Sequence, residues 1–397
     1  MCQSKISISM LDTVVLSIKN AELFIQKPER FSPPIWWLDR SQAYPSRNMK
    51  HILNIKSENL NYPKLTVSPY YIGDSAYNAK LKIEFSATKI LQDENVNEPA
   101  YDQMIEVIPV LQSRLKDADI HIPIESLKNA QADVIHFSKN IAITGGYSIS
   151  SITKTISNLG INRKLDVKKD RYQHEGHSLY IDCGSYQLII YDKVQDAFET
   201  LRHCFDDNRT EKQQKLLKAL RSHHKNSEIF RFEVRLHNRT HINTLFQKLG
   251  FEPNPTFKDI LNPAVSQAVL KHFWGIITPS RTDYLLKNTG DDTYSTIANY
   301  LISNNINMRP SEVMALALYY HHSREFGIRN TQAIFEKLHT PRTWYRHSKK
   351  YQTVISEMTE NLNPYSWVTE IESVLNEYKP FQLEEVVNSF DYVKQSN

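Results

Sequence analysis

The sequence predicts an α+β fold, in which a mainly antiparallel sheet with covering helices is followed by a helical region. Three observations support this class. Several short runs alternate apolar and polar residues, as strands do when one face is buried. Two such runs flank an Asp-Cys-Gly-Ser turn at residues 182–185, which predicts a hairpin. From about residue 242 onward the apolar spacing is mainly helical, so we place a boundary between domains 1–242 and 243–397.

The first quarter of the chain predicts strands around a proline-rich loop. Strands are expected at residues 10–18, 51–55, 64–70 and 81–87, and a short helix at 20–26. The segment 28–45 carries four prolines and the pair Trp36 and Trp37, which is typical of an irregular loop with an aromatic anchor. In the strand at 81–87 alternate residues face opposite sides, so Lys82 and Glu84 share the polar side.

The middle of the chain predicts further strands with polar faces. Helices are expected at residues 99–115, 148–159 and 196–222, and strands at 133–143, 177–181, 186–193 and 230–237. The last strand alternates without exception. Its apolar set, which should face the core, is Phe230, Phe232, Val234 and Leu236; its polar set is Arg231, Glu233, Arg235 and His237.

Composition limits the classes of protein that fit. The chain has 397 residues, 40% of them hydrophobic and 23% charged, as soluble globular proteins do. No apolar run reaches the length of a membrane span and no signal-like segment opens the chain, so we expect a cytoplasmic protein without membrane partners. The cysteines, Cys2, Cys183 and Cys204, form no CxxC pair, which argues against a zinc ribbon or a disulfide framework. A net charge of +4 permits nucleic-acid binding without indicating it.

Polar residues on four strands could meet on one face of the sheet. They are Lys82 and Glu84; His136, Ser138 and Asn140; Tyr191 and Lys193; and Arg231, Glu233, Arg235 and His237. This set suits transesterification at a phosphodiester: a tyrosine attacks phosphorus, carboxylate and imidazole hold a divalent ion, and Arg or Lys stabilise the added charge. The alternative is a solvent-facing side with no chemical role, which antiparallel sheets commonly have.

Tyr191 and Lys193 are two residues apart in a predicted strand and should point the same way. An ammonium beside a phenol favours the phenolate, which makes Tyr191 a candidate nucleophile. A phenol and an ammonium also form an ordinary surface pair, and most of the 21 tyrosines must be structural.

The C-terminal region predicts a DNA-binding motif. Helices are expected at residues 311–325, 331–338 and 342–352, and the segment 331–352 resembles a helix-turn-helix. No acid occurs from residue 341 to 351. The cationic and aromatic residues that could lie against phosphates are Arg342, Trp344, Tyr345, Arg346, His347, Lys349 and Lys350. The alternative is a solvated basic face.

The order of these motifs resembles a known family. The motifs are Ile-Glu-Phe-Ser-Ala-Thr-Lys-Ile-Leu-Gln (83–92), Leu-Ile-Ile-Tyr-Asp-Lys (188–193), Phe-Arg-Phe-Glu-Val-Arg (230–235) and Leu-His-Thr-Pro-Arg-Thr-Trp-Tyr-Arg (338–346). They are similar to the filamentous-phage gene II replication initiators, of the phage/plasmid replication protein II/X family, over roughly residues 10–352. The resemblance implies an HUH-like nicking domain. Such an initiator nicks one strand at an origin through a tyrosine, keeps the 5′ phosphate as a phosphotyrosine and later rejoins the ends.

The resemblance also assigns roles to residues. Tyr191 falls at the nucleophile, with Lys193 beside it, and Tyr180 is the second candidate. Glu233 corresponds to an acidic metal ligand flanked by Arg231 and Arg235. The implied cofactor is a divalent ion, Mg²⁺ or Mn²⁺. The implied partners are origin DNA, a host helicase and a replication polymerase.

One departure from the family concerns the metal. Where the family has Arg-Ile-Asp, this chain has His136, Phe137 and Ser138, and a serine is a poor ligand for a hard cation. We expect His136 and Asn140 to replace the missing aspartate, or Glu84 to contribute. Two other functions stay open: a DNA-binding regulator of replication that does not nick, and a metal-dependent nuclease that uses water.

Overall fold

The computed structural model describes residues 10–39, 44–55, 61–73, 76–143, 148–158, 166–173, 178–202, 214, 228–278, 293–304, 306–360 and 367–383. Within them the strands are β1 (Leu11–Lys19), β2 (His51–Asn54), β3 (Lys64–Ile72), β4 (Ala76–Ser86), β5 (Gln131–Ile143), β6 (Asp166–Gln173), β7 (Ser178–Cys183), β8 (Tyr186–Asp192) and β9 (Glu228–Leu236). The predicted helical stretch 196–222 lies mostly outside the described residues, as does the end of the predicted helix 148–159.

The helices begin with three short 3₁₀ turns, η1 (Ala21–Leu23), η2 (Pro28–Arg30) and η3 (Trp36–Leu38). The α-helices of the first half are α1 (Ala87–Gln92), α2 (Tyr101–Ile105), α3 (Val107–Asp117), α4 (Ile124–Lys128), α5 (Ile149–Asn158) and α6 (Lys193–Arg202). Those of the second half are α8 (Arg239–Lys248), α9 (Phe257–Ile260), α10 (Pro263–Ile277), α12 (Thr293–Ser303), α13 (Pro310–Phe326), α14 (Ile328–Leu338), α15 (Pro341–Glu360) and α16 (Trp367–Glu377). None of these helices combines the length and apolar character needed to cross a membrane.

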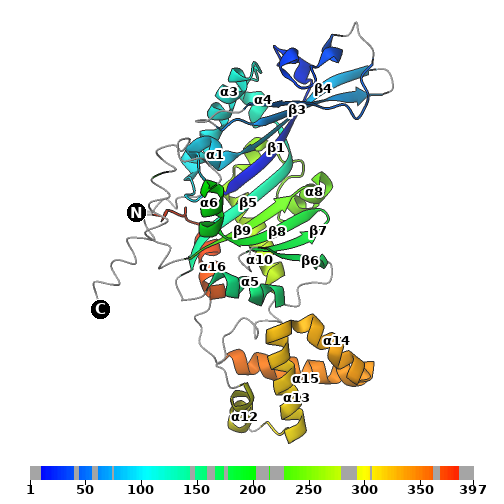
Figure 1. Ribbon diagram of the computed structural model, residues 1–397, viewed down its shortest axis with the longest axis vertical. Coiled ribbons are helices and arrows are strands. Elements are labelled where there is room, and N and C mark those ends of the chain that lie inside the picture. The colour runs from blue at the N-terminus through cyan, green and yellow to red at the C-terminus, as the bar shows by residue number, and fades with distance from the viewer. Residues whose placement is uncertain are drawn as a thin grey trace, which may run out of the picture.

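The strands form one antiparallel sheet of nine strands, in the order β2-β3-β4-β1-β5-β9-β8-β7-β6 (Figure 1). The α+β class with a mainly antiparallel sheet is therefore confirmed. The N-terminal strand β1 lies inside the sheet between β4 and β5, and β9 follows β5 although about ninety residues separate them along the chain. Pairing between distant segments thus places the candidate site residues next to one another.

Alternation along β9 buries its apolar set as predicted. Phe230, Phe232, Val234 and Leu236 are fully buried and belong to the main hydrophobic core. The rings of Phe230 and Phe232 pack against Trp274 of α10, with centroids 6.1 and 5.7 Å away. The opposite set of β9 therefore lies on the other face of the sheet, where the polar cluster forms.

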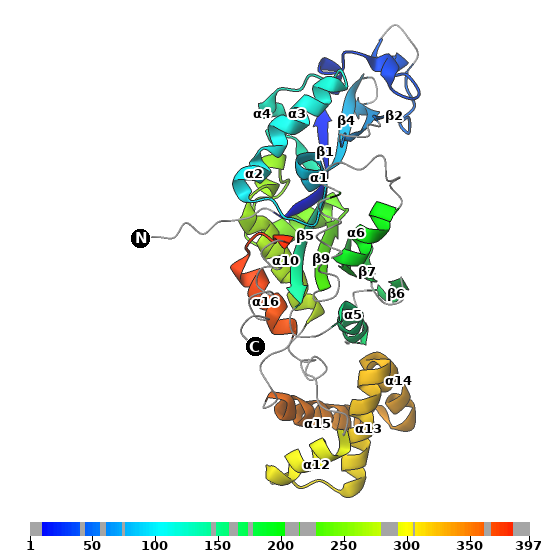
Figure 2. The ribbon, with the colours of Figure 1, turned by 60° about the vertical axis from the view of Figure 1, so that its left-hand side comes forward.

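Three helices at or after the predicted boundary near residue 242 pack on the sheet. Helix α8 contacts β9, α10 contacts β5 and β9, and α16 contacts α10 and β5, so all three helices belong with the sheet. The apolar faces of these helices complete the core that the sheet alone cannot cover. The helices α12 to α15 instead gather at one end of the molecule (Figures 1 and 2).

The helices α13, α14 and α15 pack around an aromatic core. Tyr319 lies 5.6 Å from Phe335, 5.9 Å from Trp344 and 5.6 Å from Tyr351, centroid to centroid. Gly327, between α13 and α14, has a φ of 86°, a conformation that favours glycine. Only residues 339 and 340 separate α14 from α15, so the predicted segment 331–352 does contain two helices joined by a short turn.

Candidate functional site

The polar face of the sheet gathers predicted site residues from three neighbouring strands. Across β5 and β9, His136 lies opposite Arg235 and Asn140 opposite Arg231. Across β8 and β9, Tyr191 lies opposite Arg231. Directly opposed residues of antiparallel strands point to the same side, so these side chains form one cluster.

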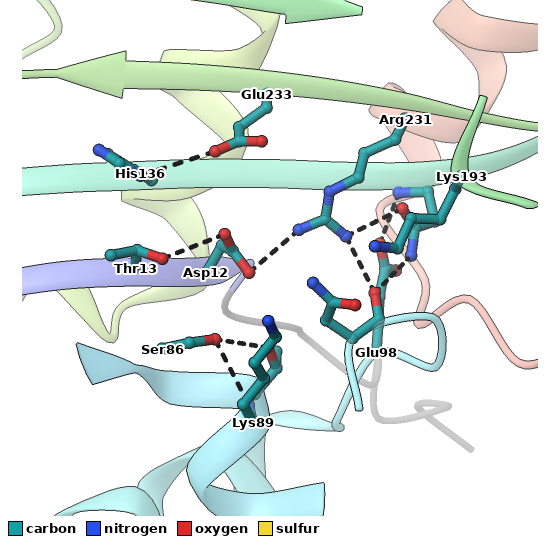
Figure 3. A network of polar contacts seen from close by, with 12 residues as sticks. Asp12, Thr13, Ser86, Lys89, Glu98, His136, Lys193, Arg231 and Glu233 are labelled. Atoms are coloured by element: carbon teal, nitrogen blue, oxygen red, sulfur yellow. Dashed lines mark hydrogen bonds and ion pairs between the residues drawn. The ribbon is translucent and has the colours of Figure 1, made fainter. Parts of the chain in front are cut away.

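Asp12, His136 and Glu233 offer three ligand atoms that lie within 4.8 Å of one another. His136 Nδ1 is 3.6 Å from Glu233 Oε1. Figure 3 shows the three side chains reaching toward a common space from β1, β5 and β9. Within the described residues, no other group of three or more acidic, histidine or cysteine side chains brings its ligand atoms so near to one another. A carboxylate, an imidazole and a second carboxylate form a donor set that suits Mn²⁺ or Mg²⁺.

The protonation state of His136 is the one that a metal ligand requires. Burial, together with the nearby Arg235 guanidinium, lowers the pKa of His136 to about 3, so the ring is neutral at physiological pH. Its Nε2 is buried and has no hydrogen-bond partner. A neutral imidazole with a free lone pair is the form that binds metals.

Asp12 was not among the predicted site residues. It is an isolated acid in an otherwise largely apolar strand, and it is buried beside Arg231, with Oδ1 3.1 Å from Nη2. Burial opposes ionisation, but Arg231 and Lys193 outweigh it and lower the pKa of Asp12. This carboxylate can supply the aspartate that is missing at Ser138. The feature of the sequence that could have identified Asp12 is a single acidic residue within a strand that is otherwise largely apolar.

Two of the predicted metal ligands lie elsewhere. The Asn140 side chain donates to the Val96 carbonyl at 2.7 Å and accepts from Arg231 at 3.1 Å. Glu84 is half-exposed and lies 3.7 Å from Lys64. Asn140 and Glu84 therefore do not join the group of Asp12, His136 and Glu233, since internal partners hold the amide and β4 places the carboxylate outside the cluster.

Arg231 lies at the centre of the cluster. Its guanidinium contacts Asp12 and also donates to the Asn95 carbonyl at 3.0 Å and to Asn140 Oδ1 (Figure 3). Only 3% of its side chain is exposed. These contacts fix a buried cation beside the group of Asp12, His136 and Glu233.

The Glu233 carboxylate is held from the other side. Arg235 Nε donates to Glu233 Oε1 at 2.8 Å, and about a third of the Arg235 side chain is exposed. Arg235 therefore has a different position from Arg231: it lies at the rim of the cluster.

Tyr191 and Lys193 are neighbours, although strand β8 is one residue shorter than the predicted strand. Strand β8 ends at Asp192, whose carboxylate accepts from the backbone of Val194 and Gln195 and so starts α6 at Lys193. Lys193 Nζ is 5.8 Å from the Tyr191 ring centroid and donates to Asp196 at 2.6 Å. The two side chains thus meet across a strand–helix junction.

The electrostatics of this pair differ from the prediction. Burial, with the Glu233 carboxylate, raises the pKa of Tyr191 well above its ordinary value, although Arg231 acts the other way. Burial and Arg231 lower the pKa of Lys193. The closed site therefore favours the neutral phenol over the phenolate.

Tyr180 shares the sheet face with Tyr191. It lies in β7 opposite Ile189, one strand further from Glu233, and is half-buried. The second tyrosine is thus close to the cluster but outside its centre.

A buried ion pair beside the site was missed. Lys139 Nζ donates to Glu98 Oε2, and both side chains are nearly inaccessible. Glu98 Oε1 also accepts from the backbone N–H of Asn140 at 2.6 Å. Glu98 thus caps the edge of β5 and anchors the loop that holds Arg231.

The predicted DNA-binding residues divide into two groups. Arg342, Tyr345, Arg346 and Lys349 are exposed on α15. Trp344 is buried in the aromatic core, and Lys350 Nζ lies 3.2 Å from Glu312. The indole of Trp344 therefore cannot contact DNA, because packing within the helical body requires it.

Neither a protein-family model, nor a curated protein, nor a solved structure matches this chain.

Proposed function

We propose that the protein nicks and rejoins one strand of DNA at a replication origin, through a tyrosine that forms a 5′-phosphotyrosine intermediate. The observation that supports this is the gathering of Tyr191, Arg231 and the Asp12–His136–Glu233 group on one sheet face. An antiparallel sheet with a histidine and carboxylates on one face agrees with an HUH-like nicking domain.

The reaction is a transesterification. The Tyr191 phenolic oxygen bonds to phosphorus, the bond from phosphorus to the 3′ oxygen breaks, and the phenolic proton leaves for that 3′ oxygen. Arg231 and Lys193 stabilise the charge on the phosphate, and Arg235 at the rim positions Glu233. Because one phosphodiester replaces another, the reverse reaction rejoins the strand.

Asp12, His136 and Glu233 would hold a divalent ion, Mg²⁺ or Mn²⁺. When bound, such an ion polarises the scissile phosphate. Before binding, the Arg231 guanidinium keeps the Asp12 carboxylate ionised and oriented. The site thus needs no proton loss from Asp12 or His136 to accept a cation.

Helix α15 would contact duplex DNA at the origin through Arg342, Tyr345, Arg346 and Lys349, which are exposed on it. A host helicase and a replication polymerase are the partners expected of an initiator.

The experiment that tests this function seeks a covalent product. The protein is mixed with single-stranded or supercoiled origin DNA and Mn²⁺, and the products are separated under denaturing conditions. We expect a protein-linked 5′ product that Tyr191→Phe abolishes and that the matched control Tyr180→Phe retains.

Hydrolysis by a metal-bound water is the second candidate, because the raised pKa of Tyr191 disfavours its phenolate in the closed site. Cleavage that survives Tyr191→Phe without an adduct would support it. DNA binding with no cleavage at all would indicate a regulator.

A further inference from the structure

A second stretch of the sheet, formed by β3, β4 and β1, has a polar face that no function above uses. Ser68, Lys80 and Lys19 lie in register across these strands, and Thr66, Lys82 and Ser17 form the next row. The alternate residues are buried: Leu65, Val67, Leu81, Ile83 and Leu16. The buried set packs into the core with residues of α3, so the polar set lies on the opposite side of the sheet.

This face carries an excess of positive charge. Its cations are Lys19, Lys64, Lys80, Lys82 and Arg239, and its carboxylates are Glu84 and Asp133. Five cations against two carboxylates, among the described residues, leave an excess of three positive charges.

Three of these cations share one carboxylate as their ion-pair partner. Asp133 lies 3.1 Å from Lys80, 4.0 Å from Lys82 and 3.9 Å from Arg239. About half of the Lys82 side chain and 41% of the Arg239 side chain remain exposed. Lys82 and Arg239 therefore keep most of their capacity to meet an anion.

An aromatic ring lies among the cations. Lys19 Nζ is 4.6 Å from the ring centroid of Tyr70, and Tyr70 is half-buried beside the rows of short side chains. Cations for phosphates and a ring for bases are the combination that single-stranded nucleic acid requires.

The face is continuous with the candidate site. Strand β1 carries Lys19 at one end and Asp12 near the other, about 23 Å apart at the usual rise of a strand. The register shift between Leu11 and Val14 lets Asp12 share the face of Lys19, although strict alternation would separate them. A chain of phosphates that follows β1 would therefore run from the basic face to the Arg231 guanidinium.

We propose that the face formed by Lys19, Tyr70, Lys80, Lys82 and Lys64 binds single-stranded DNA that flanks the cleavage site. This inference rests on the proposed nicking function, because it takes the strand end at Tyr191 as its reference. Short side chains between the cations let an extended strand lie flat, whereas α15 is the element shaped for a duplex groove.

The test measures binding of a fluorescent oligothymidine to the Tyr191→Phe protein in EDTA, so that cleavage does not contribute. Replacing Lys64 and Lys82 together by Ala should make the negative slope of log affinity against log salt shallower by about 1.4, that is about 0.7 for each lost phosphate contact. Tyr70→Leu should weaken binding about tenfold. The matched control is Lys128→Ala, which removes an exposed cation from α4.

Unchanged affinity and slope in both basic-face variants would overturn the proposal, as would a loss confined to duplex DNA. Crosslinking of iodouridine DNA to the otherwise unaltered Tyr191→Phe chain gives a second measurement that needs no face variant. Crosslinks within residues 17–19 or 64–82 support the proposal, and crosslinks only elsewhere contradict it. If the protein nicks DNA but the basic-face variants and the crosslinks show no binding at this face, only the proposal for this face is refuted. If the protein binds single-stranded DNA here but forms no covalent adduct, the tyrosine mechanism is refuted.

Discussion

His136 shows how burial prepares a single residue for its role. Its side chain is 13% exposed and lies beside Arg235 and the edge of His237, so a proton on the ring would be both poorly hydrated and repelled. The ring is therefore neutral over most of the accessible pH range.

This state predicts a pH dependence of stability. The pKa of His136 is about 3 in the fold and about 6.5 in the unfolded chain, so the unfolded chain binds more protons between these values. Its contribution to the free energy of unfolding should be fully present above pH of about 6.5 and be lost as the pH falls toward about 3. In denaturant titrations in EDTA, the free energy of unfolding should fall less steeply with decreasing pH for His136→Gln than for the wild type. If it falls equally in both proteins, His136 is not the group responsible for this pH dependence.

The sequence predicted some site residues and could not predict others. Arg231 and Glu233 follow from the alternation of one strand, because period two decides which face a residue takes. Asp12 joins them only because β1 is inserted beside β5, a pairing that no local pattern specifies. Asn140 was on the correct face but lost its expected role to hydrogen bonds with a loop.

At the scale of elements, the segment after α16 returns to the site. Residues 378–383 follow α16. The backbone of Phe381 makes two hydrogen bonds with Glu98: its carbonyl accepts from the Glu98 N–H, and its N–H donates to the side-chain Oε2 of Glu98. Phe381 and Leu383 pack with Val96 and Val194 in a second small apolar cluster. This C-terminal strap thus holds the loop whose Asn95 carbonyl fixes Arg231.

The strap should contribute to both stability and order. Phe381→Ala should lower the free energy of unfolding by about 3 kcal/mol, because a nearly buried ring is removed. Hydrogen exchange in residues 94–98 should become faster. The control is Lys379→Ala, a change at an exposed residue of the same strap, which should alter neither the free energy of unfolding nor the exchange rate. Equal effects of the two variants would show that the Phe381 ring does not hold the loop.

On α15, packing and exposure predict different results for neighbouring residues. Trp344→Ala should destabilise the helical body by about 3 kcal/mol, because the indole fills the core beside Tyr319 and Phe335. Arg346→Ala should leave thermal stability nearly unchanged and weaken duplex binding, most strongly at low salt. Thermal unfolding and anisotropy on the same samples separate the two effects. A stable Trp344→Ala protein with weakened DNA binding would reverse this assignment.

At the scale of the whole molecule, the sheet joins segments that lie far apart in the sequence. The α+β class was predicted because strands and helices differ in their apolar period. Helical periodicity alone placed the boundary near residue 242, and it could not show that α10 and α16 pack on the sheet as well as on each other. The helical body gathered at one end of the molecule is instead α12 to α15.

This arrangement predicts that origin recognition and strand cleavage can be uncoupled. Replacing Arg342 and Arg346 together by Ala should reduce nicking of supercoiled origin DNA more than tenfold, since each phosphate contact adds affinity. Cleavage of a short single-stranded origin fragment should stay close to that of the wild type, because α15 lies apart from β8, the strand that carries Tyr191 (Figure 1). An equal loss on both substrates would place α15 in the cleavage step itself.

The central claim is that Tyr191 becomes covalently joined to the 5′ end of the cleaved strand. The most direct measurement is mass spectrometry of peptides from the protein–DNA adduct after the DNA has been digested to a residual nucleotide. The account predicts the added nucleotide mass on the peptide that contains Tyr191, with the oxygen of that side chain as the attachment site. An adduct on another residue, or complete cleavage with every tyrosine unmodified, would contradict it.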